Sequence, residues 1–171
     1  PLFPERKAYV AKYDLSPAEA SLYTAVSEYV RDEFNRAEQL KEGKKQTVGF
    51  ALTVLQRRLA SSPEAIYQSL RRRRVRLESE MNEAVTLQRG GQVSSFDPSK
   101  LDLGLDDEFD DDELTDDDRE AAEGEIADRA TAAQTIAELQ AEICTLLRLE
   151  NLADQIRRSD TDSKWSQLRE L

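Results

Sequence analysis

The stretch LQRRLASSPEAI, residues 55–66, joins two helices that carry apolar stripes. Ser62 is a preferred helix N-cap residue and Pro63 suits the first helical position, so a new helix is expected to begin here. The pair Arg57–Arg58 lies near the end of the helix before this turn, and four consecutive arginines, Arg71–Arg74, follow it. The sequence therefore predicts a short turn that sets the angle between a buried helix and an arginine-bearing one.

Upstream, the sequence predicts a short extended N-terminal arm, residues 1–15, and then a first helix. Ser16 is the candidate N-cap, Pro17 suits the first helical position and Glu19 completes a capping box. Gly43 is the expected stop. The residues that recur at helical spacing on the expected buried face are Leu22, Val26, Tyr29, Val30, Ala37 and Leu40.

A second helix, from about 45 to 60, is apolar over most of its girth and is predicted to be the central one. Gly49 would permit close packing against a neighbour. Its stripe consists of Val48, Ala51, Leu52, Leu55 and Leu59, widened by Phe50 and Val54. The stripe of the third helix, which should end near Gly90 and Gly91, consists of Ile66, Leu70, Leu77, Met81 and Ala84.

The net charge of −11 is concentrated in one window. Residues 97–120 contain 13 acidic and two basic residues, which sums to −11, so the rest of the chain is neutral. Like charges repel one another and stay solvated, which predicts an acidic flexible linker over 91–115. Two interpretations of this insert stay open: a plain linker, or an electrostatic mimic of nucleic acid that competes for basic surfaces.

After the linker, a long helical region is predicted over 116–158, with a bend near Gly124. Its near-heptad spacing suits antiparallel packing against the third helix, and Cys144 inside the stripe is expected to be buried and inert. A further amphipathic helix should begin within SKWSQLREL, residues 163–171, with Trp165 as an anchor. The stripe of the long region includes Ile136, Leu139, Ile143, Leu146 and Leu147.

These elements predict an all-α fold, a helical bundle with a long projecting antiparallel helical hairpin. Three parts are expected along the chain. Residues 1–90 would form the helical body and the start of the projecting helix, residues 91–115 the acidic linker, and residues 116–171 the returning helix and a truncated lead-in to a following domain.

Several function classes are excluded by composition. The chain has no histidine and one cysteine, which rules out a histidine-based triad, zinc chemistry and a disulfide framework within it. It has no GxxxxGK[ST] loop, and its acidic run lacks the spacing of an EF-hand, so neither a catalytic nor a metal site is predicted. No apolar run approaches the roughly 20 residues of a membrane span, and we expect a cytoplasmic protein without membrane contact.

The arginines of the third helix carry the strongest binding signal. Arg71, Arg72, Arg73, Arg74 and Arg76 are the candidate contacts to nucleic-acid phosphates. The alternative is a solvated face on which these arginines pair with Glu64, Glu78 and Glu80 at helical spacing.

Four segments carry a resemblance to a known family: Leu2–Arg6, Leu15–Tyr23, Val48–Ile66 and Asp162–Leu171. LFPERKAYVAKYDLSPAEASLYTAVSEYV, from residue 2, and VGFALTVLQRRLASSPEAIYQSL, from residue 48, resemble the segment between the two RecA-like motor lobes of bacterial SWI/SNF-type superfamily 2 helicase-like ATPases. DSKWSQLREL looks like the lead-in to the second lobe. The resemblance covers about half of the chain.

The resemblance implies a non-catalytic segment of an ATP-dependent helicase or nucleic-acid translocase that braces its two motor lobes. The family's catalytic motifs lie outside this chain, so the chain itself would need no cofactor and hydrolyse no ATP, whereas ATP and Mg²⁺ are implied for the parent. Candidate bracing residues are Arg57, Arg58 and Trp165. Expected partners are the flanking RecA-like lobes and duplex DNA or RNA, with self-association of the isolated chain as a further expectation. The alternative function is a stand-alone helical protein–protein interaction module.

Overall fold

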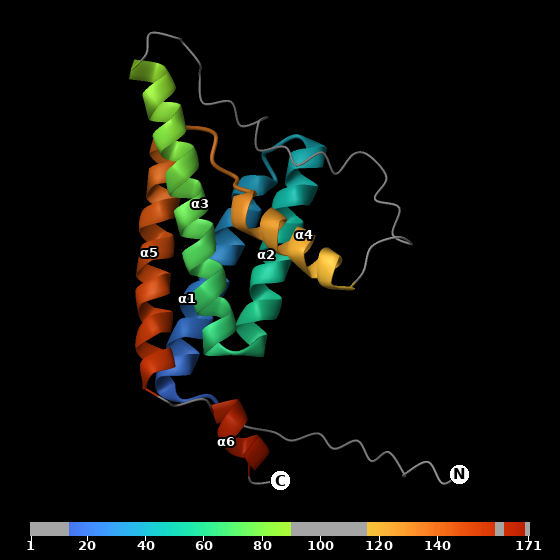
Figure 1. The fold of residues 1–171 in the computed structure, drawn as a ribbon, viewed down its shortest axis with the longest axis vertical. Coiled ribbons are helices and arrows are strands. Elements are labelled where there is room, and N and C mark those ends of the chain that lie inside the picture. Colours follow the sequence, from blue (N-terminus) through green and yellow to red (C-terminus); the bar gives the residue numbers. More distant parts are fainter. Residues whose placement is uncertain (1–13, 90–115, 160–162, 170–171) are drawn as a thin grey trace, which may run out of the picture.

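The computed structural model of the protein describes residues 14–89, 116–159 and 163–169. These residues form six helices and no strand: α1 (Pro17–Ala37), α2 (Glu42–Ser61), α3 (Pro63–Arg89), α4 (Asp116–Arg129), α5 (Ile136–Arg158) and α6 (Ser163–Arg169). Figure 1 shows α3 and α5 antiparallel along one side of the bundle, with α1 beside them and α4 crossing α2. The predicted all-α bundle with an antiparallel hairpin is confirmed, and the last turns of α3 reach beyond the other helices.

Two sequence predictions fall largely outside the described residues. They are the extended arm, of which only residues 14 and 15 are described, and the acidic linker over 91–115.

The start of α1 follows the prediction. The Glu19 amide donates to the Ser16 hydroxyl oxygen at 3.2 Å, and the Ser16 amide donates to the Glu19 carboxylate at 2.8 Å. The same carboxylate also accepts from the amide of Ser163 at 3.0 Å and from its hydroxyl. Burial acts to raise the pKa of Glu19, but the hydrogen bonds from Ser163 and Ser16 lower it. Glu19 therefore caps α1 and also fixes the start of α6 against it.

The turns on both sides of α2 show one correct prediction and one wrong one. The Ala65 amide donates to the Ser62 hydroxyl at 3.1 Å, which confirms the predicted cap of α3. Gly43, the expected stop of α1, lies instead in the first turn of α2. The chain leaves α1 earlier because Gln39 and Leu40 donate to carbonyls three residues back and turn it before Gly43.

The core is built from the predicted stripes of α1, α2, α3 and α5. A Cβ added at Gly49 would lie 3.4 Å from the Phe34 ring, in keeping with the expected close packing of α2 on a neighbour. Three predicted core residues are wrong: Phe50, Leu147 and Cys144 are exposed. Each of them lies next to a buried residue. Successive residues of an α-helix are rotated by about 100°, so these three side chains point to the outer face of their helices.

The long helix predicted over 116–158 is in fact two helices. Gly124 lies inside α4, and the break falls at residues 130–135. Residues 130–133 of this segment are buried, and the Thr131 hydroxyl donates to Glu142 and accepts from the Ala133 amide at 3.0 Å. The connection lets α4 cross α2 and α3 while α5 returns alongside α3.

Replacing Thr135 by alanine should destabilise the protein by about 1 kcal/mol. Thr135 is the N-cap of α5, its hydroxyl accepts from the Glu138 amide at 3.2 Å, and Glu138 completes a capping box. Thermal or urea unfolding measures the effect. Thr145→Ala, which removes a hydroxyl from the interior of the same helix, is the matched control, and an equal loss in both variants would contradict the capping role.

Candidate functional site

Arg73 occupies the centre of the bundle, not its surface. Its side chain is 0% exposed. The guanidinium donates to the Tyr29 hydroxyl at 2.9 Å, to the Ala127 carbonyl at 2.6 Å and to the Glu142 carboxylate at 2.8 Å. The prediction that Arg73 contacts phosphate is therefore wrong, because three partners inside the protein use its guanidinium.

The partners of Arg73 also bond to one another. The Tyr29 hydroxyl donates to Glu142 at 2.8 Å, and the Thr131 hydroxyl donates to the other oxygen of this carboxylate. Burial raises the pKa of Tyr29 well above its usual range despite the nearby Arg73, which keeps the phenol protonated as a donor. Desolvation acts to lower the pKa of Arg73, but Tyr29 and Glu142 raise it overall. We call Tyr29, Arg73, Thr131 and Glu142 the buried polar network.

Glu33 lies beside this network. The residue is 4% exposed. One of its oxygens accepts from Arg36 at 3.2 Å, and the other has no hydrogen-bond partner among the described residues. Burial, with the nearby Glu142, raises the pKa of Glu33 to about 7.

Arg74 is also largely used within the protein. Its guanidinium donates to Glu150 of α5 and, at 2.8 Å, to Glu78 one turn further along α3. The hydrogen bond to Glu150, acting against partial burial, raises the pKa of Arg74. Arg74 thus fastens α3 to α5, and its side chain is 17% exposed.

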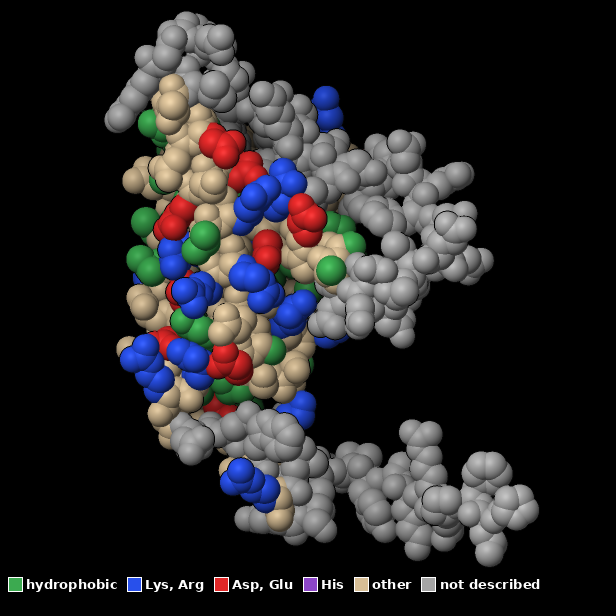
Figure 2. All heavy atoms as spheres, viewed as in Figure 1, with side chains coloured by type: hydrophobic (Ala, Val, Ile, Leu, Met, Phe, Trp, Pro, Cys, Tyr) green, Lys and Arg blue, Asp and Glu red, His purple; other side chains and the backbone are tan. Residues whose placement is uncertain are grey.

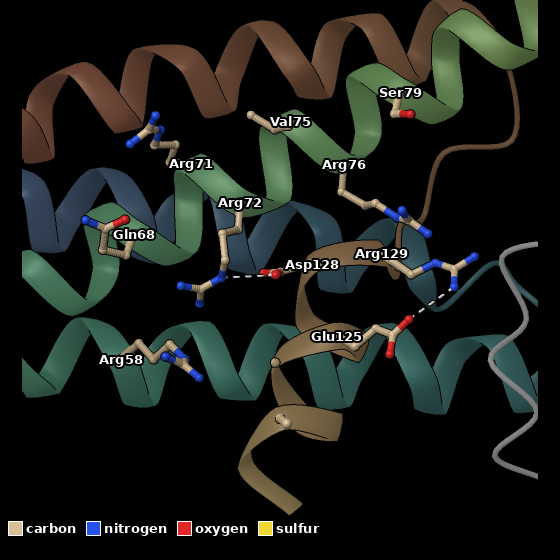
Figure 3. A pocket seen from close by; sticks show the side chains of 12 residues that line it. Arg58, Gln68, Arg71, Arg72, Val75, Arg76, Ser79, Glu125, Asp128 and Arg129 are labelled. Atoms are coloured by element: carbon tan, nitrogen blue, oxygen red, sulfur yellow. Dashed lines mark hydrogen bonds and ion pairs between the residues drawn. The ribbon is translucent and has the colours of Figure 1, made fainter. Parts of the chain in front are cut away.

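The other three predicted phosphate contacts, Arg71, Arg72 and Arg76, line one groove. This groove, of about 1020 Å³, lies between α2, α3 and α4. Figure 3 shows the arginines of α3 along one side, Arg58 of α2 facing them, and α4 between the two helices. We call this site the arginine groove; its lining is Arg58, Gln68, Arg71, Arg72, Val75, Arg76, Ser79, Ala121, Gly124, Glu125, Asp128 and Arg129.

The arginine groove has an excess of positive charge, because five arginines line it against two carboxylates. Arg72 donates to Asp128 at 3.1 Å. Burial raises the pKa of Asp128, although Arg72 acts against it. Arg71 makes no ion pair or hydrogen bond with any residue that the structure describes. Figure 2 shows arginine and lysine side chains over the middle of this face, with carboxylates between them.

Arg76 and Arg129 share one carboxylate. Arg76 lies 3.5 Å from Glu80, Arg129 lies 3.6 Å from the same oxygen, and Arg129 also contacts Glu125 at 3.4 Å. The side chain of Arg76 remains 45% exposed. Arg71, Arg72 and Arg76 are all exposed and stand on one helix.

The predicted bracing residues Arg57 and Arg58 lie against α4. Arg57 pairs with Glu123, and its side chain is 63% exposed. A Cβ added at Gly124 would lie 3.9 Å from the Arg58 guanidinium. Trp165 lies in α6, and its side chain is outside the described set. Their role between motor lobes stays a prediction.

Within residues 14–89, 116–159 and 163–169, no group of three or more histidine, cysteine, aspartate or glutamate side chains is placed to hold a metal ion. No helix in that part of the chain is long and apolar enough to cross a lipid bilayer. Comparison of the chain with protein-family models, curated proteins and solved structures finds no match.

Proposed function

We propose that the chain is a non-catalytic helical segment of an ATP-dependent helicase or nucleic-acid translocase. It braces two motor lobes and contacts the phosphate backbone of a duplex through the arginine groove. The observation that carries this proposal is the groove's excess of arginine over carboxylate, together with Arg71, whose guanidinium pairs with none of the residues that the structure describes. ATP and Mg²⁺ belong to the parent motor and not to this segment.

The spacing of the arginines supports contact with a regular row of charges. Arg72 and Arg76 lie one helical turn apart, about 6 Å along the axis of α3. A DNA duplex carries one negative charge per about 1.7 Å of its axis. Several phosphates therefore fall within reach of the groove, and each arginine can donate two hydrogen bonds to one of them.

The connections at the base of the bundle support the bracing role. Ser163 at the start of α6 bonds to Glu19 at the start of α1. Lys164 donates to the Ser61 carbonyl, where α2 ends, at 3.2 Å. Both ends of the described chain thus meet at one end of the bundle, as Figure 1 shows. A compact bundle held in this way can transmit a change in the relative position of the two motor lobes to the arginine groove.

Neutralising two groove arginines should weaken duplex binding. We expect Arg71→Gln with Arg76→Gln to lower the affinity for a 20-base-pair DNA or RNA duplex by about tenfold in low salt. The slope of log K against log salt should fall by about 2, because two phosphate contacts are lost. Fluorescence anisotropy titrations across a salt series measure both quantities.

The matched control is Arg31→Gln with Arg148→Gln, which removes the same charge from exposed positions on α1 and α5. It should leave the affinity and the salt slope nearly unchanged. Equal weakening in both double variants would show that only overall charge matters and would remove the groove as the site.

The alternative function, a stand-alone protein–protein interaction module, is favoured by a different observation. A small cleft at the base of the bundle, lined by Leu59, Pro63 and Ile66 among others, is flanked by two exposed apolar residues. Leu15 is 42% exposed and Tyr23 is 49% exposed. Absence of duplex binding at any salt concentration would favour this alternative.

A further inference from the structure

The helix α4 pairs with one arginine of the groove, Arg72, and with Arg57, a bracing candidate that lies outside the groove lining. Glu123 pairs with Arg57 of α2, and Asp128 pairs with Arg72 of α3. Their arginine partners remain 63% and 45% exposed. In this arrangement, side-chain carboxylates of α4 take the position that phosphates would take on the same guanidinium groups.

Among the described side chains of α4, the buried apolar ones lie at its C-terminal end. Ile126 and Ala127 are buried, and the Ala127 carbonyl accepts from Arg73. The connection that follows, residues 130–133, is buried as well. Between Ala121 and Glu125, by contrast, every described side chain is exposed or only half-buried. Gly124 adds a residue with low helix propensity to this half.

The two halves of α4 therefore differ in what holds them. The C-terminal end, which carries Asp128, is anchored in the core, whereas the segment from Ala121 to Glu125 is joined to another described helix by one printed ion pair, that of Glu123 with Arg57. Ion pairs that are partly exposed contribute little stability and are screened by salt. A polyanion that offers several phosphates to the same arginines can replace them.

We propose that α4 is an intramolecular competitor of nucleic acid: Glu123 and Asp128 occupy Arg57 of α2 and Arg72 of α3. Duplex phosphates displace Glu123 together with the Ala121–Glu125 half, and they exchange with the Asp128 carboxylate on Arg72 while the C-terminal end stays anchored. This inference rests on the proposed function, because it assigns the regulation of the same groove. It gives Arg57 and Arg58 a second role, in which they hold α4 in the absence of a duplex.

The first test compares two double variants by anisotropy with a 20-base-pair DNA duplex at low salt. Glu123→Gln with Asp128→Asn keeps the side-chain shapes and removes the competing charges, and it should tighten binding by about five- to tenfold. Glu123→Gln alone should tighten it by a smaller factor and guards against misfolding caused by the half-buried Asp128. Unchanged affinity in both would overturn the competitor role.

The matched control is Glu38→Gln with Glu83→Gln. These exposed carboxylates make no ion pair with a described residue, and their loss changes the net charge by the same amount. Binding should tighten by less than twofold. Equal tightening in the control and in the α4 variant would show an effect of overall charge and would overturn the proposal.

The second test needs no nucleic acid. Hydrogen–deuterium exchange of the full chain should show faster exchange of residues 121–125 in 500 mM than in 50 mM salt, with residues 127–133 unchanged. Exchange that is independent of salt would overturn the ion-pair attachment. If exchange responds to salt and no variant binds duplex, the attachment of α4 stands and the proposed function fails, so the two failures are distinguishable.

Discussion

Replacing Arg73 by methionine should destabilise the bundle by about 3–5 kcal/mol, the largest effect expected of a single substitution here. Methionine fills a similar volume but leaves Glu142 charged and buried without its cation. It also removes the donors to Tyr29 and to the Ala127 carbonyl. A buried carboxylate without a cation costs more free energy than the loss of one hydrogen bond, because no ion pair then offsets the cost of removing its charge from water.

The substitution Arg73→Lys separates charge from geometry. Lysine keeps the positive charge, but it cannot present the planar fork that reaches three acceptors on three helices. We therefore expect a loss of about 2 kcal/mol, intermediate between the wild type and Arg73→Met. Urea unfolding monitored by circular dichroism gives the free energies.

Two further variants make the result specific to the network. Arg71→Met makes the same chemical change on the exposed side of the same helix and should alter stability by less than about 0.5 kcal/mol. The double variant Arg73→Met with Glu142→Gln should recover part of the loss, because no unpaired charge then remains buried. A loss below 1 kcal/mol for Arg73→Met would show that Arg73 is not the central support of the bundle.

The sequence contains evidence for the buried polar network, although the run of arginines around Arg73 makes it hard to recognise. Arg73 stands between Leu70 and Leu77 on the stripe of α3, at the spacing of a core position. Glu142 stands between Leu139 and Leu146 on the stripe of α5 in the same way. Opposite charges at stripe positions of two antiparallel helices predict a buried ion pair. The four consecutive residues Arg71–Arg74 do not form one uniform patch, because consecutive side chains on a helix point in different directions.

Other features could not be predicted because they depend on tertiary contacts. The capping signals at Ser16 and Ser62 are local, and both were correct. The break between α4 and α5, by contrast, is not determined by the neighbouring sequence alone. Its residues Ala130–Ala133 have good or moderate helix propensity, and they leave the helix because the buried Thr131 bonds to Glu142. The same applies to Cys144, whose exposure depends on which face of α5 meets α3.

Raising the pH should destabilise the protein through Glu33. The pKa of Glu33 in the folded protein is about 7, against 4.5 for an exposed glutamate, with burial as the main cause and Glu142 as the next. Arg36 and Arg73 act in the opposite direction, and Asp32 adds to the increase. Between these two pH values the folded state holds a proton that the unfolded state has lost, so the free energy of unfolding falls as pH rises.

The size of this effect follows from the two pKa values. One pKa unit corresponds to about 1.4 kcal/mol, so a difference of about 2.5 units bounds the contribution of Glu33 at roughly 3–4 kcal/mol. Stability from this group is fully present below pH 4.5, declines through the interval and is lost once pH exceeds about 7. Carboxylates with a lowered pKa, such as Glu19, act with the opposite sign and at more acidic pH.

The substitution Glu33→Gln separates the contribution of Glu33 from that of the other carboxylates that titrate in the protein. Glutamine resembles the protonated carboxyl, so the variant should match the wild type near pH 4.5 and exceed its stability at pH 8 by about 2–3 kcal/mol. Glu28→Gln, at an exposed position on the same helix, should give a difference from the wild type that does not vary with pH. Chemical unfolding at a series of pH values measures these differences. Parallel curves for the wild type and Glu33→Gln would show that the pKa of Glu33 does not differ between the folded and unfolded states. An advantage of glutamine that rises with pH would instead establish that the folded protein holds the Glu33 proton more tightly than the unfolded chain does, as burial of this carboxyl beside Glu142 predicts.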